Sequence, residues 1–308
     1  MISAITDGPV GSTGIRLREG IAMSDADVKG RPRPSLFRAL GKNDPPMRVE
    51  VDGETFDRLE IFKHDSWAAT SIYGNAGGRI ICKFNRKQWI LFIPMGWLGR
   101  WLAYREGWFY RLLADLPCIA PPCGPVSVDG VIQKNAVAHR FVDGHPLGEK
   151  EKPSETFYSE LEQCLAEVHR RGVAYMDLHK RENIVVGDDG RGYLVDFQVS
   201  FYAKPDGWNF PGRWLLGGFQ AGDRYHLMKH KMKTLEMPRE EALALIDRER
   251  PWWLRIHRFI AAPLRNLRRK LLVLLGIRKG KGRAQTEHFT EDGLREHAPA
   301  DPSERRAA

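Results

Sequence analysis

Three oxygen-bearing side chains in the middle of the sequence have types and spacing that suit chemistry on phosphate. Asp177 lies in a polar stretch after a segment of helical periodicity, Asn183 begins the apolar stretch 183–186, and Asp196 follows the apolar stretch 193–195. A Gly-Asp-Asp-Gly turn joins the two apolar stretches, which predicts a hairpin that brings the three side chains together. Phosphoryl transfer requires one carboxylate that orients a hydroxyl and two oxygen ligands for Mg²⁺.

The stretch around these residues, Tyr-Met-Asp-Leu-His-Lys-Arg-Glu-Asn and then Val-Asp-Phe-Gln, resembles the catalytic loop and metal-binding motif of the protein-kinase-like fold. The resemblance implies that Asp177 is the catalytic base and that Asn183 and Asp196 bind Mg²⁺. It also implies that Lys180 corresponds to the lysine of a Lys-x-Glu-Asn run, near the nucleotide.

Features upstream are similar to the same fold. Lys83, in the apolar run 80–84, matches the lysine that holds the α- and β-phosphates of ATP, and Glu106 matches its ion-pair partner on the following helix. Residues 138–144 resemble the hinge that binds adenine, and the whole match covers residues 58–230. The resemblance implies an α+β fold with a small β-rich N-lobe, a mostly helical C-lobe, and ATP and Mg²⁺ as cofactors.

The catalytic loop departs from the usual pattern in three ways. The spacing from Asp177 to Asn183 is one residue longer than usual, with His179 as the extra residue. Tyr175 replaces the usual histidine, and Met176 replaces the arginine that would bind an activation-loop phosphate. Control by that phosphate is therefore not expected.

The phosphate loop and the metal-binding motif depart as well. Residues 63–66 contain no glycine, so this loop is not expected to approach the phosphates as closely as a glycine-rich loop does. Lys63 and backbone N–H groups of the loop are still expected to help bind the phosphates. Gln198 replaces the glycine that usually follows Asp-Phe. This style is similar to atypical bacterial branches of the fold, namely lipopolysaccharide core-sugar kinases, RIO-type kinases and aminoglycoside or small-molecule phosphotransferases.

Each of these residues also has a purely structural interpretation. Asp177 and Asp196 belong to a residue type that often caps turns. Lys83 would fit an outward-facing strand position, and Glu106 would fit an exposed ion pair on a helix. A pseudokinase, which keeps the fold and lacks phosphoryl transfer, is a further alternative.

The expected elements alternate between short strands and helices. Strands are predicted at 58–63, 67–73, 79–84, 126–128, 131–133, 137–141, 183–186 and 193–195, and residues 74–78 form a hairpin turn. Helices are predicted at 97–116, from Ser154 onward with a Ser cap, and from Arg213 to about Gly276.

Composition divides the chain into five segments. We expect a disordered arm (1–46), an N-lobe (47–143), a C-lobe (144–250), a basic amphipathic helical segment (251–283) and a disordered tail (284–308).

The charge of the protein is concentrated in one of these segments. The net charge is +9, and residues 251–283 alone contain ten Lys/Arg and no Asp/Glu, so the remainder is nearly neutral. Its leucines recur at helical spacing beside Trp252 and Trp253, which is typical of a helix that binds an anionic membrane surface. The charge-free stretch 89–99 would enter the lipid beside it. The alternatives are a helix packed on the C-lobe and, less favoured, a nucleic-acid site without a recognisable module.

Localisation follows from what the sequence lacks. The N-terminus has no secretory-signal pattern, no apolar run is long enough to span a bilayer, and the four cysteines form no zinc pattern. We therefore expect a cytoplasmic protein with free thiols, bound peripherally to the inner membrane face. The predicted activity is an ATP- and Mg²⁺-dependent phosphotransferase. Its acceptor is a sugar hydroxyl of a membrane glycolipid of the lipopolysaccharide core type, with a Ser/Thr protein kinase or a membrane-associated pseudokinase scaffold as the alternatives.

Overall fold

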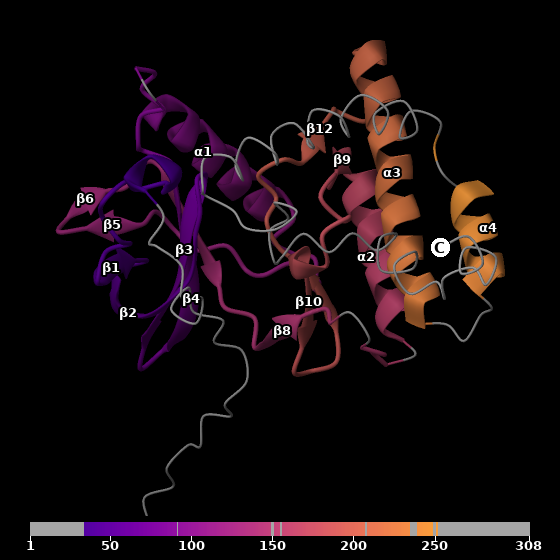
Figure 1. Ribbon diagram of the computed structural model, residues 1–308, viewed down its shortest axis with the longest axis horizontal. Coiled ribbons are helices and arrows are strands. Elements are labelled where there is room, and N and C mark those ends of the chain that lie inside the picture. The colour runs from indigo at the N-terminus through magenta and orange to yellow at the C-terminus, as the bar shows by residue number, and fades with distance from the viewer. Residues whose placement is uncertain are drawn as a thin grey trace, which may run out of the picture.

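The computed structural model describes residues 34–90, 92–148, 151–154, 156–206, 208–234, 239–248 and 251. Most strands gather at one end of the molecule and helices α2, α3 and α4 at the other, with α1 running between them (Figure 1). The helices are α1 Gly96–Leu112, α2 Phe157–Arg170, α3 Phe210–Thr234 and α4 Arg239–Arg248, with short 3₁₀ helices η1 Ser35–Phe37 and η2 Arg181–Asn183. The strands are β1 Arg48–Val51, β2 Glu54–His64, β3 Ala68–Asn75, β4 Gly78–Asn85, β5 Ser127–Val128, β6 Val131–Ile132, β7 Ala136–Arg140, β8 Gly144–Pro146, β9 Val173–Ala174, β10 Ile184–Gly187, β11 Gly192–Leu194 and β12 Phe201–Tyr202.

Seven strands form one antiparallel sheet in the order β6-β5-β1-β2-β3-β4-β7. The predicted hairpin turn is confirmed: Asn75 pairs with Gly78, and the Asn75 side chain accepts the Gly77 N–H at 2.8 Å. One face of the sheet covers a buried cluster that includes Phe56, Tyr73 and Ile80. The predicted strands of this region are confirmed, although β2 begins earlier, at Glu54.

Helix α1 packs across β4 and β7. Gly99 is required where the helix crosses the chain at Arg86, because a Cβ at position 99 would collide with the Arg86 carbonyl oxygen. The helix ends at Leu112, earlier than predicted, and the Leu113 N–H closes its last turn on the Phe109 carbonyl at 3.1 Å. This packing brings the buried face of α1 against the end of the sheet.

A second buried cluster joins the end of α1 to α2, α3 and the small sheet β11-β10-β8. Helix α2 contributes Phe157, Leu161 and Leu165, the apolar positions that its spacing predicts. The pair β9–β12 lies beside α3. The chain is therefore a mixed fold of antiparallel sheets and helices, in agreement with the predicted combination of elements.

Two sequence expectations are wrong in detail. Ser154 does not cap α2: the N-cap is Thr156, without a side-chain cap, and Ser154 supplies only its carbonyl to the Phe157 N–H at 3.1 Å. Residues 34–46, part of the predicted disordered arm, pack on the sheet. Ala39 is fully buried there, and the Tyr73 hydroxyl donates to the Pro46 carbonyl at 2.7 Å.

The expectation of free thiols holds for only some cysteines. Cys118 and Cys164 form a disulfide that links the chain after α1 to α2, with Cα atoms 6.3 Å apart. Cys82 and Cys123 are free. Burial raises the pKa of the Cys123 thiol to about 11, so it is protonated at neutral pH.

The basic segment 251–283, apart from Pro251, and the tail 284–308 lie outside the described residues, as does most of the arm. The described helices include none with the length and apolar character to cross a bilayer.

Candidate functional site

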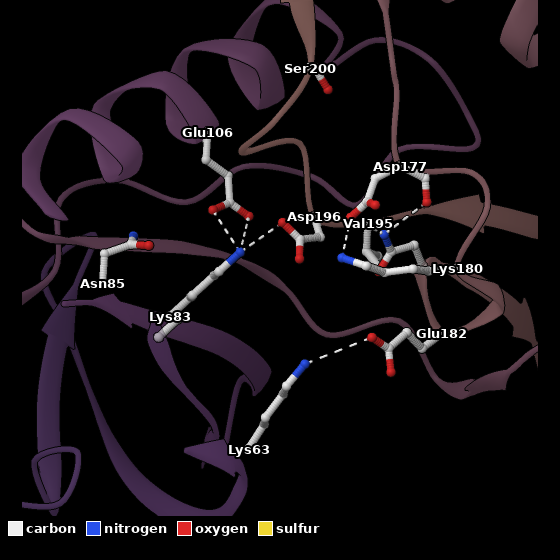
Figure 2. Close-up of polar contacts among 12 residues, drawn as sticks. Lys63, Lys83, Asn85, Glu106, Asp177, Lys180, Glu182, Val195, Asp196 and Ser200 are labelled. Carbon is white, nitrogen blue, oxygen red and sulfur yellow. Dashed lines mark hydrogen bonds and ion pairs between the residues drawn. The ribbon is translucent and has the colours of Figure 1, made fainter. Parts of the chain in front are cut away.

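The ammonium of Lys83, near the end of β4, is shared by two carboxylates (Figure 2). Its Nζ atom lies 3.1 Å from Glu106 Oε2 and 2.8 Å from Asp196 Oδ1. Lys83 is 8% exposed and Glu106 is 2% exposed. Burying an ammonium without a partner is costly, so this position requires the two carboxylates. The alternatives of an outward-facing strand lysine and an exposed helix pair are therefore wrong.

A chain of three aromatic rings fixes the position of Glu106. Tyr110 lies one turn after Glu106 on the same face of α1, and its ring packs edge-on against Phe197 at 5.2 Å. Phe197 packs edge-on against Tyr175 at 5.0 Å. These contacts connect α1 to the segment after Asp196 and to the catalytic loop, so the three parts of the site are held in one arrangement.

The backbone at Asp196 turns its carboxylate toward Lys83. Asp196 has a φ of 65°, a left-handed conformation that costs a non-glycine residue about 1–2 kcal/mol. Its N–H donates to the Tyr110 hydroxyl at 3.3 Å. The hydrogen bond and the ion pair with Lys83 offset this cost and orient the side chain.

Asp177 is buried in the loop 175–183 and is surrounded by donors. Its Oδ2 accepts from Lys180 Nζ at 2.7 Å and from Asn183 Nδ2 at 2.9 Å. Its Oδ1 lies 3.4 Å from His179 Nδ1. The Asn183 amide group also donates to the Asp177 carbonyl at 3.2 Å, which fixes Asn183 against the loop.

Two successive turns take up the additional residue of the loop. The Lys180 N–H donates to the Asp177 carbonyl at 3.2 Å, and the Asn183 N–H donates to the Lys180 carbonyl at 3.3 Å. The Val195 N–H then donates to the Asn183 carbonyl at 3.1 Å, which places Asp196 beside this loop. The predicted convergence of Asp177, Asn183 and Asp196 is therefore observed, despite the longer spacing.

The sequence analysis did not predict a role for Asp223, a buried carboxylate on α3 that accepts hydrogen bonds from the backbone just before Asp177. It accepts the N–H groups of Tyr175 and Met176, both at 2.7 Å, and lies 3.1 Å from His169 Nε2. Met176 has a φ of 68°, and its bond to Asp223 stabilises that conformation immediately before Asp177. The signal in the sequence was a single acidic residue, Asp223, within the stretch predicted to be helical from Arg213.

Several backbone N–H groups of the turn between β2 and β3 are bonded within the turn. The Asp65 carboxylate accepts the N–H groups of Trp67 and Ala68 at 2.7 and 3.0 Å. Within the range 63–66, the Asp65 N–H donates to the Ala68 carbonyl at 3.0 Å and so does not face a phosphate. Lys63 is the side-chain candidate from this turn, and its Nζ lies 3.5 Å from Asp65 and 3.8 Å from Glu182 Oε1. Lys63 thus reaches from the sheet to the catalytic loop (Figure 2).

The pKa values of the two carboxyl groups around Lys83 are shifted in opposite directions, upward for Glu106 and downward for Asp196. Burial raises the pKa of Glu106 to about 7, with Asp196 adding to the increase and Lys83 opposing it. Burial would also raise the pKa of Asp196, but the charge of Lys83 holds it below its ordinary value. Burial would lower the pKa of Lys83, but the two carboxylates raise it above its ordinary value. At neutral pH Asp196 is thus charged and Glu106 is close to its titration point.

The donors fit a magnesium ion carried in by a nucleotide. Asn183 uses its amide nitrogen on Asp177, so its amide oxygen is the atom left to bind a cation. Asp196 uses Oδ1 on Lys83 and keeps its second oxygen. The described residues contain no group of three or more His, Cys, Asp or Glu able to hold a metal alone. Mg²⁺ is suited to such a site because it binds through one or two protein oxygens plus substrate phosphates.

The expected hinge follows β7. His139 is buried, stacks on Tyr110 at 4.9 Å, and donates from Nδ1 to the Arg140 carbonyl at 2.8 Å. Burial lowers the pKa of His139 to about 4, so the ring is neutral at pH 7. The end of the sheet near Lys83 therefore contains an uncharged ring and no second positive charge from His139.

No protein-family model matches the sequence, and no curated protein matches it. Among solved structures, the Rio2 kinase from Chaetomium thermophilum is similar, with 13% sequence identity and a TM-score of 0.40. The similarity covers 60% of this chain and 55% of that one, so the chain spans about half the length of that structure.

Proposed function

We propose that this protein is an ATP- and Mg²⁺-dependent phosphotransferase of the protein-kinase-like fold, with a two-lobed arrangement around the site. The observation that carries the proposal is the buried Lys83 ammonium between Glu106 and Asp196, next to a loop in which Asn183 holds Asp177. A buried ion-pair network of this kind needs a functional reason, because apolar residues would fill the same space at lower cost.

Each residue has a distinct role in the proposed reaction. Lys83 binds the α- and β-phosphates, and Glu106 holds its ammonium in place. Asn183 and Asp196 hold Mg²⁺, which supplies charge neutralisation to the phosphates. Asp177 orients the acceptor hydroxyl and takes its proton on Oδ1, since Oδ2 is bonded to Lys180 and Asn183.

For the acceptor, we propose a sugar hydroxyl of a membrane glycolipid of the lipopolysaccharide core type. The support is the sequence alone: the atypical kinase motifs, together with the basic segment 251–283 that is predicted to bind an anionic membrane surface. Peripheral attachment to the inner membrane face belongs to the same proposal.

A nucleotide-binding scaffold without transfer is the second candidate. It is favoured by one observation: Asp65 accepts the N–H groups of Trp67 and Ala68, so these two groups of the β2–β3 turn are not available to a phosphate. The two candidates agree on Mg²⁺-dependent nucleotide binding and differ only in the chemical step.

The test is an acceptor screen with γ-labelled ATP on lipid, sugar and protein fractions of membrane extracts. We expect wild type and Asp177→Ala to bind Mg²⁺-nucleotide alike, with transfer reduced about 10²–10⁴-fold in the variant. The matched control is Asp188→Ala, which removes an exposed carboxylate in the nearby turn and should leave transfer unchanged. A wild-type protein that binds no Mg²⁺-nucleotide would refute both candidates. Binding without transfer to any fraction would leave only the scaffold.

A further inference from the structure

A hollow of about 300 Å³ lies at the edge of the large sheet, and its lining includes neither Lys83 nor the residues that contact Lys83. The start of α1 and the β5–β6 hairpin form its walls, and these elements lie at the outer end of the sheet (Figure 1). Three cationic side chains from three separate segments line it: Lys87 after β4, Arg100 on α1 and Lys134 after β6.

The hollow contains unbalanced positive charge. None of the described residues that line it is acidic. The Lys87 ammonium donates to a neutral amide, Gln133 Oε1, at 2.9 Å. Burial lowers the pKa of Lys87, as expected for an ammonium that loses water and has no carboxylate partner. Arg100 lies over the helix start, since a Cβ on Gly96 would be 3.7 Å from its guanidinium.

The start of α1 adds to this field. Its N-cap residue, Met95, provides no side-chain cap, and the first turn contains no acidic residue. The first N–H groups of a helix have no partner within the helix, and the helix dipole favours an anion at this end. Gly96, the first residue of the helix, lines the hollow. The three cations and the helix start therefore point to the same ligand class, an anion.

Apolar side chains surround the hollow and face the solvent. Val131 and Ile132 line it and are 64% and 57% exposed. Beside Gly96, Trp97 is 58% exposed, and Phe92 in the preceding loop is 91% exposed. Binding of a small soluble anion does not require exposed apolar side chains near the site. Large exposed apolar surfaces mark contact with a partner or a membrane.

Hydrogen bonds hold the chain on both sides of Phe92. Ile90 and Ile93 exchange two backbone hydrogen bonds of 3.1 and 2.9 Å. The buried Arg86 guanidinium binds the carbonyls of Gln88 and Trp89 at 2.8 and 3.1 Å and so fixes the chain between Lys87 and this turn. Phe92 therefore lies in a stretch of chain that is anchored at both ends, between Lys87 and the start of α1.

We propose that this hollow binds the anionic, phosphate-bearing headgroup of a membrane lipid. Lys87, Arg100 and Lys134 contact the phosphate, and Phe92 and Trp97 enter the interfacial layer, where aromatic residues are favoured. The site rests on the membrane attachment that belongs to the proposed function and adds a headgroup site beside the stretch 89–99, which is predicted to enter lipid. It requires neither nucleotide nor phosphoryl transfer. It also differs from the predicted role of residues 251–283, because it lies on the folded sheet.

The experiment measures co-sedimentation of the full chain, without nucleotide, with vesicles of phosphatidylcholine alone or mixed with phosphatidylglycerol. The test variant carries Lys87→Ala, Arg100→Ala and Lys134→Ala. The control carries Arg48→Ala, Arg170→Ala and Lys231→Ala, which removes the same charge at positions paired with carboxylates on other faces. We expect the test variant to bind anionic vesicles about 100-fold more weakly than wild type, and the control to lose less than about tenfold.

Further variants separate the possible outcomes. Phe92→Ser with Trp97→Ser is expected to weaken vesicle binding while leaving the thermal midpoint unchanged, as both side chains are exposed. Asp177→Ala should bind vesicles like wild type. Vesicle binding therefore tests the headgroup site independently of whether the protein transfers phosphate. Equal loss in the test and control triples would overturn the headgroup site. So would loss of inorganic phosphate or RNA binding in the test triple with vesicle binding unchanged.

Discussion

The carboxylate of Asp223 should be one of the most sensitive positions for both stability and activity. It is 1% exposed and accepts two backbone N–H groups of the catalytic loop at 2.7 Å. Asp223→Ala leaves both N–H groups buried without an acceptor, at about 1–3 kcal/mol each. The expected loss is about 2–6 kcal/mol, a large part of the 5–15 kcal/mol that typically stabilises a domain.

Activity should fall further than the loss of folded protein explains. Met176 holds a left-handed conformation next to Asp177, and its N–H bond to Asp223 stabilises it. Without that bond the loop relaxes and Asp177 moves, and a displacement of about 1 Å can cost about 10²-fold in rate. Asp223→Asn keeps one acceptor oxygen, so we expect a loss of about 1–3 kcal/mol in a variant that still folds.

The assay is urea unfolding followed by tryptophan fluorescence and circular dichroism, with phosphoryl transfer measured on the folded fraction. The matched control is Asp189→Ala. Asp189 also accepts a backbone N–H and a hydroxyl, from Arg191 and Tyr193, but in an exposed turn where water replaces it, so the loss should stay below about 1 kcal/mol. An Asp223→Ala protein that unfolds at the wild-type urea midpoint would refute the reasoning.

Three further predictions concern the Glu106 carboxyl group and the β8–β10 pair. Glu106, with a pKa raised to about 7, gains a proton as the pH falls through 7 and then no longer holds the Lys83 ammonium by charge. Nucleotide affinity, measured in binding titrations of the free protein, should therefore decrease toward acid pH. Glu106→Gln should remove this pH dependence of the affinity. The folded state also holds this proton between pH 4.5 and about 7 where the unfolded chain releases it, so Glu106 should lower stability as pH rises through that window, and Gln should abolish the slope in thermal melts. Gly144→Ala places a Cβ against the Val186 carbonyl and 2.8 Å from Gly187 Cα, so β8 must shift, and unfolding should show a loss of about 1–3 kcal/mol. A Gly144→Ala midpoint equal to wild type would contradict the β8–β10 register.

Local signals were enough to predict which side chains meet at the candidate site. A lysine inside an apolar strand requires a carboxylate partner, and the hairpin between Asn183 and Asp196 brings their oxygens together whatever the rest of the fold does. Strands and helices with clear alternating or helical patterns were predicted, although their ends were less accurate. The short strands β8, β9 and β12 have no such pattern and were not predicted, and the helix predicted from Arg213 is divided into α3 and α4.

Long-range contacts were beyond local signals. Asp223 lies far along the chain from Met176, and no spacing rule connects a helix residue to a loop N–H group. The hydrogen bonds inside the Asp65 turn were not predicted, although an aspartate side chain often accepts the N–H groups of the residues that follow it, here Trp67 and Ala68. The disulfide between Cys118 and Cys164 was missed because sequence separation does not reveal spatial proximity.

The Asp65 turn has a consequence for how the site would tell nucleotides apart. Since the N–H groups of Asp65, Trp67 and Ala68 are bonded within the turn, the main group that the β2–β3 side offers to a terminal phosphate is the Lys63 ammonium, and that ammonium already faces Glu182. Under the proposed function, the preference for triphosphate over diphosphate would then depend on Lys180 and the metal-binding residues beneath. The residues of the sheet would then bind the product ADP almost as tightly as ATP. Release of ADP would therefore limit the rate of repeated turnover.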